Sequence, residues 1–123
     1  MDYLELLAKV REAGNNMEIA KRELKPVFNA RSNSKEVAIL EQRYMRAARA
    51  YDQMYDQMKN VINGSENKEV MWALFYRRAK RMPWDQTYLK VYTSRSEMDI
   101  RLAVSAYLHK QYKEDWRKYS DCL

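Results

Sequence analysis

Two long apolar seams in the first half of the chain set the narrowest limits on how it can fold. The first seam alternates spacings of three and four residues and comprises Tyr3, Leu6, Val10, Ala13, Met17, Ala20 and Leu24. The second has the same alternation and comprises Val37, Leu40, Tyr44, Ala47, Tyr51, Met54, Met58 and Val61. Such spacing places every member on one side of an α-helix, as in a coiled coil. We therefore predict two heptad-patterned helices joined as an antiparallel hairpin.

The ends of these two helices are predicted from residues that start or stop a helix. Pro26 disfavours a helical conformation in the residue before it, so the first helix is expected over about residues 2–24. Residues 29–34 are predicted to form a polar loop, in which Ser34 can cap the second helix. Gly64 can end that helix in a left-handed conformation.

The rest of the chain also favours helices, because two glycines and two prolines in 123 residues are too few for a β-rich fold. Ser65 can cap a third helix over residues 66–82, and a short helix is expected over residues 84–91. A long last helix should run from Arg95 to about residue 119, and residues 120–123 should be frayed.

These elements predict an all-α fold in two regions. Residues 1–64 would be the helical hairpin, used for dimerisation or partner binding. Residues 65–123 would contain a helix-turn-helix with a long C-terminal helix. Within it, Ser94 and Glu97 have the spacing of a capping box, which predicts the start of the last helix at Arg95. A short helix, a turn and a capped longer helix are typical of a DNA-binding helix-turn-helix, whose second helix enters the major groove.

The last helix carries two apolar stripes, and they have opposite consequences. One stripe contains Met98 and Leu102, and the other contains Ile100, Val104 and Leu108. If the first stripe faces the core, the side with Ile100 is free to face DNA. If the second stripe is buried instead, this helix is a core helix and reads no base.

Positive charge is concentrated in the second region. The chain has a net charge of +6, with 23 Lys and Arg against 17 Asp and Glu. Residues 66–119 carry +5, residues 1–65 carry +2, and Asp121 supplies the remaining −1. An excess of cations on the helix-turn-helix half is the electrostatic footprint expected of a nucleic-acid binder.

Residues 70–108 resemble the helix-turn-helix of region 4 of bacterial sigma factors. Phe75-Tyr76 corresponds to an Arg-Tyr pair of that pattern, Trp84 to the opening of its second helix, and Ser94-Arg95-Ser96 to the start of its recognition helix. The layout is similar to phage late-gene transcriptional regulators of the RinA and ArpU type. Tyr92 stands where the pattern has glycine, so we expect a wider turn, because a left-handed tyrosine would be strained.

The resemblance implies a phage- or prophage-encoded transcriptional regulator in the host cytoplasm. Its partners would be double-stranded DNA, a second copy of the chain and RNA polymerase. The predicted phosphate contacts are Arg77, Arg78, Lys80, Arg81, Lys90, Thr93 and Arg95. The predicted base contacts are Ser96, Asp99, Ile100 and Arg101. The predicted dimer or partner face comprises Tyr44, Tyr51, Tyr55 and Met58.

The sequence gives little indication of any other functional class. No nucleophile set, phosphate loop or cysteine cluster indicates an enzyme or a cofactor. His109, the only histidine, lacks partners at metal-ligand spacing, and no apolar run has membrane-spanning length. We expect no metal, cofactor or small-molecule substrate. Two alternatives stay open: a phage helical protein that binds and inhibits a host nucleic-acid enzyme, and a small DNA-packaging adaptor.

Overall fold

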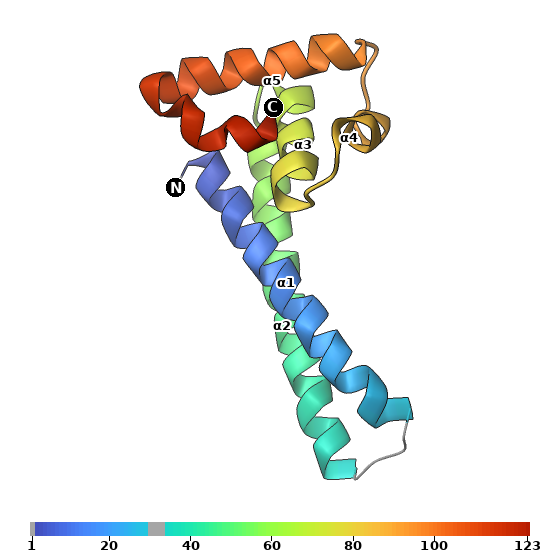
Figure 1. The fold of residues 1–123 in the computed structure, drawn as a ribbon. Helices are drawn as coiled ribbons and strands as arrows, with labels where there is room; N and C mark the ends of the chain where they lie inside the picture. Colours follow the sequence, from blue (N-terminus) through green and yellow to red (C-terminus); the bar gives the residue numbers. More distant parts are fainter. Residues whose placement is uncertain (1, 30–33) are drawn as a thin grey trace. The chain divides into compact units, whose positions relative to one another are not determined.

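The computed structural model describes residues 2–29 and 34–123, and every regular element in these ranges is a helix. The α-helices are α1 (Tyr3–Asn29), α2 (Ser34–Asn63), α3 (Lys68–Leu74), α4 (Trp84–Lys90) and α5 (Glu97–Tyr112), shown in Figure 1. A π-helical stretch, η1 (Phe75–Ala79), continues α3, and a 3-10 helix, η2 (Lys113–Cys122), follows α5. The all-α fold class is confirmed. The chain divides into two compact units, Met1–Asn60 (unit 1) and Val61–Leu123 (unit 2).

In unit 1, α1 and α2 lie side by side and run in opposite directions (Figure 1). Arg43 of α2 approaches Glu23 of α1 at 3.8 Å. A β-carbon built on Gly14 of α1 would lie 3.3 Å from the ring of Tyr51 on α2. Moving back along α1 from residue 23 to residue 14 therefore corresponds to moving forward along α2 from residue 43 to residue 51. This register is that of an antiparallel pair.

Pro26 does not end α1, contrary to our prediction. The helix continues to Asn29 with Pro26 inside its last turn. At that position proline deprives the helix of one backbone donor near an exposed end, which costs less than it would in the middle. The predicted loop at residues 29–34 falls mostly on residues 30–33, which lie outside the described residues. The predicted bounds of the second helix agree with α2, which spans Ser34–Asn63.

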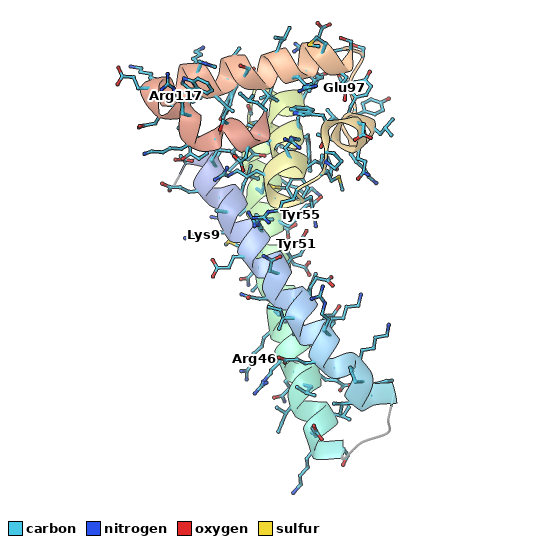
Figure 2. The ribbon with its side chains drawn as sticks, in the orientation of Figure 1. Lys9, Arg46, Tyr51, Tyr55, Glu97 and Arg117 are labelled. Atoms are coloured by element: carbon cyan, nitrogen blue, oxygen red, sulfur yellow. The ribbon has the colours of Figure 1, made fainter. Side chains whose placement is uncertain are left out.

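The predicted partner face on α2 is wrong for Met58. Met58 is completely buried, and Tyr51 packs against the backbone of α1 at Gly14. Tyr55 stacks on Tyr51 at a ring distance of 6.0 Å (Figure 2), and Tyr44 is half-buried. Tyr44, Tyr51 and Met58 belong to the heptad seam, whereas Tyr55 lies outside it. For the three half-buried tyrosines, the partner face stays a prediction.

Unit 2 is built around contacts among α3, α4 and α5. Its core contains Leu74 from α3, Phe75 from η1, Trp84 from α4, and Ile100 and Leu108 from α5. Figure 1 shows α5 lying across α3, with α4 beside them. Thr87 of α4 is also fully buried, and its hydroxyl donates to the carbonyl of Met82 at 3.4 Å.

The third helix is shorter than predicted and its final turn widens. Ser65 accepts a hydrogen bond from the N–H of Asn67 at 3.0 Å, and α3 begins at Lys68. From Phe75 the backbone is π-helical, with the N–H of Lys80 bonded to the carbonyl of Phe75 at 3.2 Å. Arg81 then has a positive φ of 53°, which stops the helix. The single helix predicted over residues 66–82 is therefore two shorter segments.

The last helix is also shorter than predicted, because the chain reverses at Lys113. This residue has φ 48° and ψ −114°, a conformation that side chains other than glycine rarely adopt. The following η2 lies against α5 and η1 rather than extending α5. Cys122 near its end is completely buried, so the prediction of a frayed tail is wrong.

The strain at Lys113 gives a testable expectation. Lys113→Gly should raise the free energy of unfolding by about 1 kcal/mol, because glycine adopts this φ without a steric cost. Thermal unfolding of both proteins measures the change. The matched control is Lys110→Gly, the same substitution inside α5, which should lower stability by about 1 kcal/mol. A loss of stability at both positions would show that Lys113 is not strained.

Candidate nucleic-acid interface

The buried side of α5 is the stripe of Ile100, Val104 and Leu108, each with an exposed fraction of 0%. Residues four apart lie on one face of a helix, and here that face packs into the core of unit 2. The prediction that Ile100 reads a base is therefore wrong: its side chain is enclosed by the protein and cannot reach a groove.

The outer side of α5 carries the other apolar stripe. Met98 is 59% exposed and Leu102 is 61% exposed. Asp99 and Arg101 lie on exposed positions between them. Of the four predicted base contacts, Ser96, Asp99 and Arg101 thus remain accessible. Met98 and Leu102, which sequence reasoning assigned to an apolar stripe and not to the interface, join them on this face.

The start of α5 is capped by Ser96 rather than by Ser94. The Ser96 hydroxyl accepts a hydrogen bond from the N–H of Asp99 at 3.1 Å, and the helix begins at Glu97 (Figure 2). The capping-box prediction therefore placed the helix start two residues too early. A cap of this kind satisfies a backbone donor that the helix itself leaves unpaired.

The connection between α4 and α5 is wide, as the tyrosine in the turn led us to expect. Lys90 ends α4 and Glu97 begins α5, so six residues separate the two helices. Tyr92 does not have a positive φ, and its side chain is fully exposed. The Thr93 hydroxyl accepts from the N–H of Arg95 at 3.0 Å, and the Tyr88 hydroxyl donates to the Arg95 carbonyl at 2.8 Å. These bonds fix the turn without a left-handed residue.

Arg77 is not a phosphate contact in this structure, contrary to our prediction. Its guanidinium donates to three main-chain carbonyls: Met82 at 2.7 Å, Asp121 at 2.7 Å and Cys122 at 3.1 Å. The π-helical turn of η1 directs the side chain toward η2, and its donors are used there.

Arg78 is likewise engaged within the chain. It pairs with the Asp121 carboxylate at 3.1 Å and lies over the Tyr119 ring at 4.8 Å from the centroid. Its side chain is only 23% exposed. In this conformation the Asp121 carboxylate occupies the guanidinium of Arg78, and its contact with phosphate stays a prediction.

The remaining predicted phosphate contacts lie on the surface. Lys80, Arg81, Lys90 and Arg95 are exposed and Thr93 is half-buried. The Lys80 ammonium lies 5.8 Å from the centre of the Phe75 ring. Arg95 approaches the Glu69 carboxylate at 3.3 Å, with 54% of its side chain exposed. Lys90, Thr93 and Arg95 come together around the turn that leads into α5, whereas Lys80 and Arg81 lie before α4.

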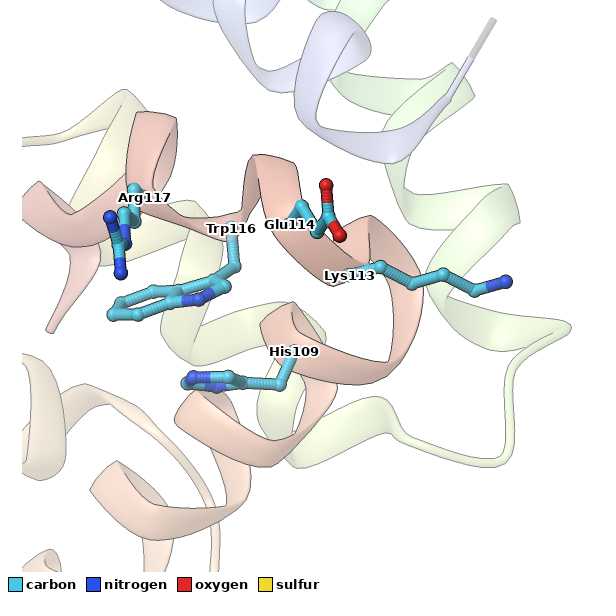
Figure 3. Close-up of a pocket in the computed structure, with 5 residues that line it drawn as sticks. All are labelled: His109, Lys113, Glu114, Trp116 and Arg117. Carbon is cyan, nitrogen blue, oxygen red and sulfur yellow. The ribbon is translucent and has the colours of Figure 1, made fainter.

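A groove that sequence reasoning missed lies where α5 meets η2. Figure 3 shows this groove, lined by His109, Lys113, Glu114, Trp116 and Arg117. The Trp116 indole and the His109 ring are 4.2 Å apart between centroids. Only the reversal at Lys113 brings these two rings together. A sequence that lacks glycine or proline at this point gives no signal for it.

Cys122 is not a reactive thiol. Its side chain is completely buried, and burial, with a smaller contribution from the Asp121 carboxylate, raises the pKa of the thiol. The thiol therefore stays protonated near neutral pH and is a poor nucleophile. Within the described residues, no group of three or more His, Cys, Asp or Glu could hold a metal ion.

Neither the helices nor known proteins offer a further indication of function. Over residues 2–29 and 34–123, none of the helices combines the length and the apolar character that crossing a membrane requires. Comparison of the chain with protein-family models, with curated proteins and with solved structures gives no match in any of the three.

Proposed function

We propose that this chain is a DNA-binding transcriptional regulator of the phage late-gene type, and that α4 and α5 are its helix-turn-helix. The observation that carries the proposal is the division of α5 into two sides. Ile100, Val104 and Leu108 hold the helix in the core, while Met98, Asp99 and Leu102 lie on the outside. A recognition helix needs this arrangement, because it must be rigidly held and still present side chains to the groove.

The proposed contacts differ from those predicted by sequence alone. Lys90 and Arg95 beside the connecting turn would bind phosphates, as exposed cations do in most protein–DNA complexes. Met98 and Leu102 would contact thymine methyl groups, and Asp99 could accept a hydrogen bond from the amino group of cytosine. An interface of this composition favours apolar contacts and shape over arginine–guanine pairing.

A salt titration tests the proposal. The affinity for a random-sequence duplex should fall steeply with salt, because bound phosphates release counterions. The double variant Lys90→Ala with Arg95→Ala should make the slope of log affinity against log salt shallower by about 2, since each phosphate that a cation neutralises adds about 0.9 to the slope. Fluorescence anisotropy of a labelled duplex at several salt concentrations measures both slopes.

The matched control removes the same charge elsewhere. Lys21→Ala with Arg22→Ala alters two exposed cations on α1 of unit 1, and it should leave the slope nearly unchanged. Equal changes from the two double variants would show that net charge, and not the face of α5, governs binding. Absence of any binding by the unmodified chain at low salt would contradict the proposed function itself.

One observation favours the alternative of a protein-binding role. Four large apolar side chains are exposed around α4 and α5: Leu89 at 81%, Tyr92 at 101%, Met98 at 59% and Leu102 at 61%. Exposed apolar side chains can mark a protein interface where they form one contiguous patch. A phage protein that inhibits a host nucleic-acid enzyme could use it. In the DNA-binding interpretation the same face would also contact RNA polymerase or a second subunit.

A further inference from the structure

The segment Asp121–Leu123 is held by a cluster of donors that we call the arginine clasp: Arg77, Arg78, Trp84 and Arg101. Arg77 donates to the carbonyls of Asp121 and Cys122, and Arg78 to the Asp121 carboxylate. The Trp84 indole N–H donates to the Leu123 carbonyl at 2.8 Å, and Arg101 approaches the same oxygen at 3.4 Å.

The clasp has the composition of an anion site. Three guanidinium groups converge on oxygen acceptors, and the fork geometry of arginine fits phosphate oxygens as well as carboxylates. Two of these groups also lie near the Trp84 ring, Arg77 at 5.3 Å and Arg101 at 5.6 Å from its centroid. The main-chain carbonyls of Asp121 and Cys122 are neutral, whereas the Asp121 carboxylate that pairs with Arg78 carries a formal negative charge.

The clasp is also placed to serve the proposed DNA interface. Arg101 is an exposed residue of α5, adjacent in sequence to Leu102 on the outer face. Met98, Arg101, Leu102, Ser105 and Leu123 line one shallow pocket. Leu123 therefore lies against the same face of α5 that would approach DNA. Its main-chain oxygen also contacts the guanidinium of Arg101, which could otherwise bind a guanine or a phosphate.

The segment is attached through weak local structure. It ends η2, a 3-10 helix that follows the strained Lys113 and is interrupted at Tyr119, with φ −115° and ψ 18°. Hydrogen-bond geometry in a 3-10 helix is poorer than in an α-helix, and segments of this kind open at a smaller cost than the core does.

We propose that the arginine clasp is a second phosphate-binding site and that Asp121–Leu123 is its internal competitor. This inference rests on the proposed DNA binding. DNA phosphates displace the segment, and the released Arg77, Arg78 and Arg101 then contact the DNA. These contacts are absent from the closed form, in which the segment stays bound to the clasp. The closed form thus binds DNA more weakly than a chain whose segment has left the clasp.

A pair of single-charge variants tests the competitor. Asp121→Asn removes the carboxylate that pairs with Arg78, whereas Asp115→Asn removes one that pairs with Lys118 at 3.7 Å on the same η2. Both variants change the net charge equally. Asp121→Asn should tighten duplex binding by roughly three- to tenfold and steepen the salt slope by about 1. Asp115→Asn should change affinity by less than about twofold.

Hydrogen exchange supplies a readout that does not depend on charge. The peptide covering residues 113–123 should exchange faster when the unmodified chain is saturated with duplex DNA, because the segment has left the clasp. Equal effects of the two variants on duplex affinity would show that Asp121–Leu123 is not a competitor. Unchanged or slower hydrogen exchange of residues 113–123 in the presence of DNA would show the same, and in both cases the proposed DNA binding would stand. Failure of the unmodified chain and both variants to bind duplex would overturn the proposed function and the competitor with it.

Discussion

Replacing Ile100 by alanine is expected to lower the free energy of unfolding of unit 2 by about 2–5 kcal/mol. The side chain is fully buried between α5 and the rest of the core, so its truncation removes apolar contacts and leaves a cavity. Urea unfolding followed by tryptophan fluorescence measures the effect cleanly, because Trp72, Trp84 and Trp116 all lie in unit 2.

Leu102→Ala is the matched control for this substitution. Leu102 lies on the same helix two residues further on, but 61% of it is exposed, so its truncation should change stability by no more than about 0.5 kcal/mol. In the proposed interface the same change should weaken DNA binding. If Ile100→Ala instead reduced DNA affinity and left stability intact, the two sides of α5 would have been assigned the wrong way round.

These two residues also show how far the sequence could predict the interface. A helix over this stretch followed from its periodicity and its capping residues. However, Met98 and Leu102 recur with the same spacing as Ile100 and Val104, so periodicity alone left the buried side undecided. The choice depends on which stripe meets Leu74, Phe75 and Trp84, and those contacts are tertiary.

The elements that end at strong local signals were predicted well. The bounds of α2 agree with the predicted start at Ser34 and stop at Gly64, and α4 begins after Pro83 as expected. Gly64 does not, however, have the left-handed conformation that we predicted for it. The reversal at Lys113 could not be predicted, because nothing in that residue's chemistry favours positive φ. Since the reversal alone brings η2 back against η1, the whole arginine clasp was hidden. The sequence consequently gave no sign that Arg77 and Arg78, which precede α4, bind the end of η2.

Arg77→Ala is expected to lower the free energy of unfolding by about 3 kcal/mol. The substitution removes three charge-assisted hydrogen bonds, each worth about 1.5–3 kcal/mol with some overlap among them. It also leaves the carbonyls of Met82 and Cys122 without their guanidinium donor. Arg117→Ala, an exposed arginine on η2, is the control and should stay within about 0.5 kcal/mol of the unmodified chain.

Arg77→Lys separates the contribution of charge from that of the guanidinium fork. Lysine keeps the positive charge, but its single ammonium cannot reach carbonyls on both Met82 and η2 in the directions that Nε, Nη1 and Nη2 cover. Stability should therefore fall by about 1–2 kcal/mol, between the unmodified chain and Arg77→Ala. Full stability in the lysine variant would mean that charge alone holds the segment. A loss as large as with alanine would mean that the fork, and through it the connection between η1 and η2, supplies the whole effect.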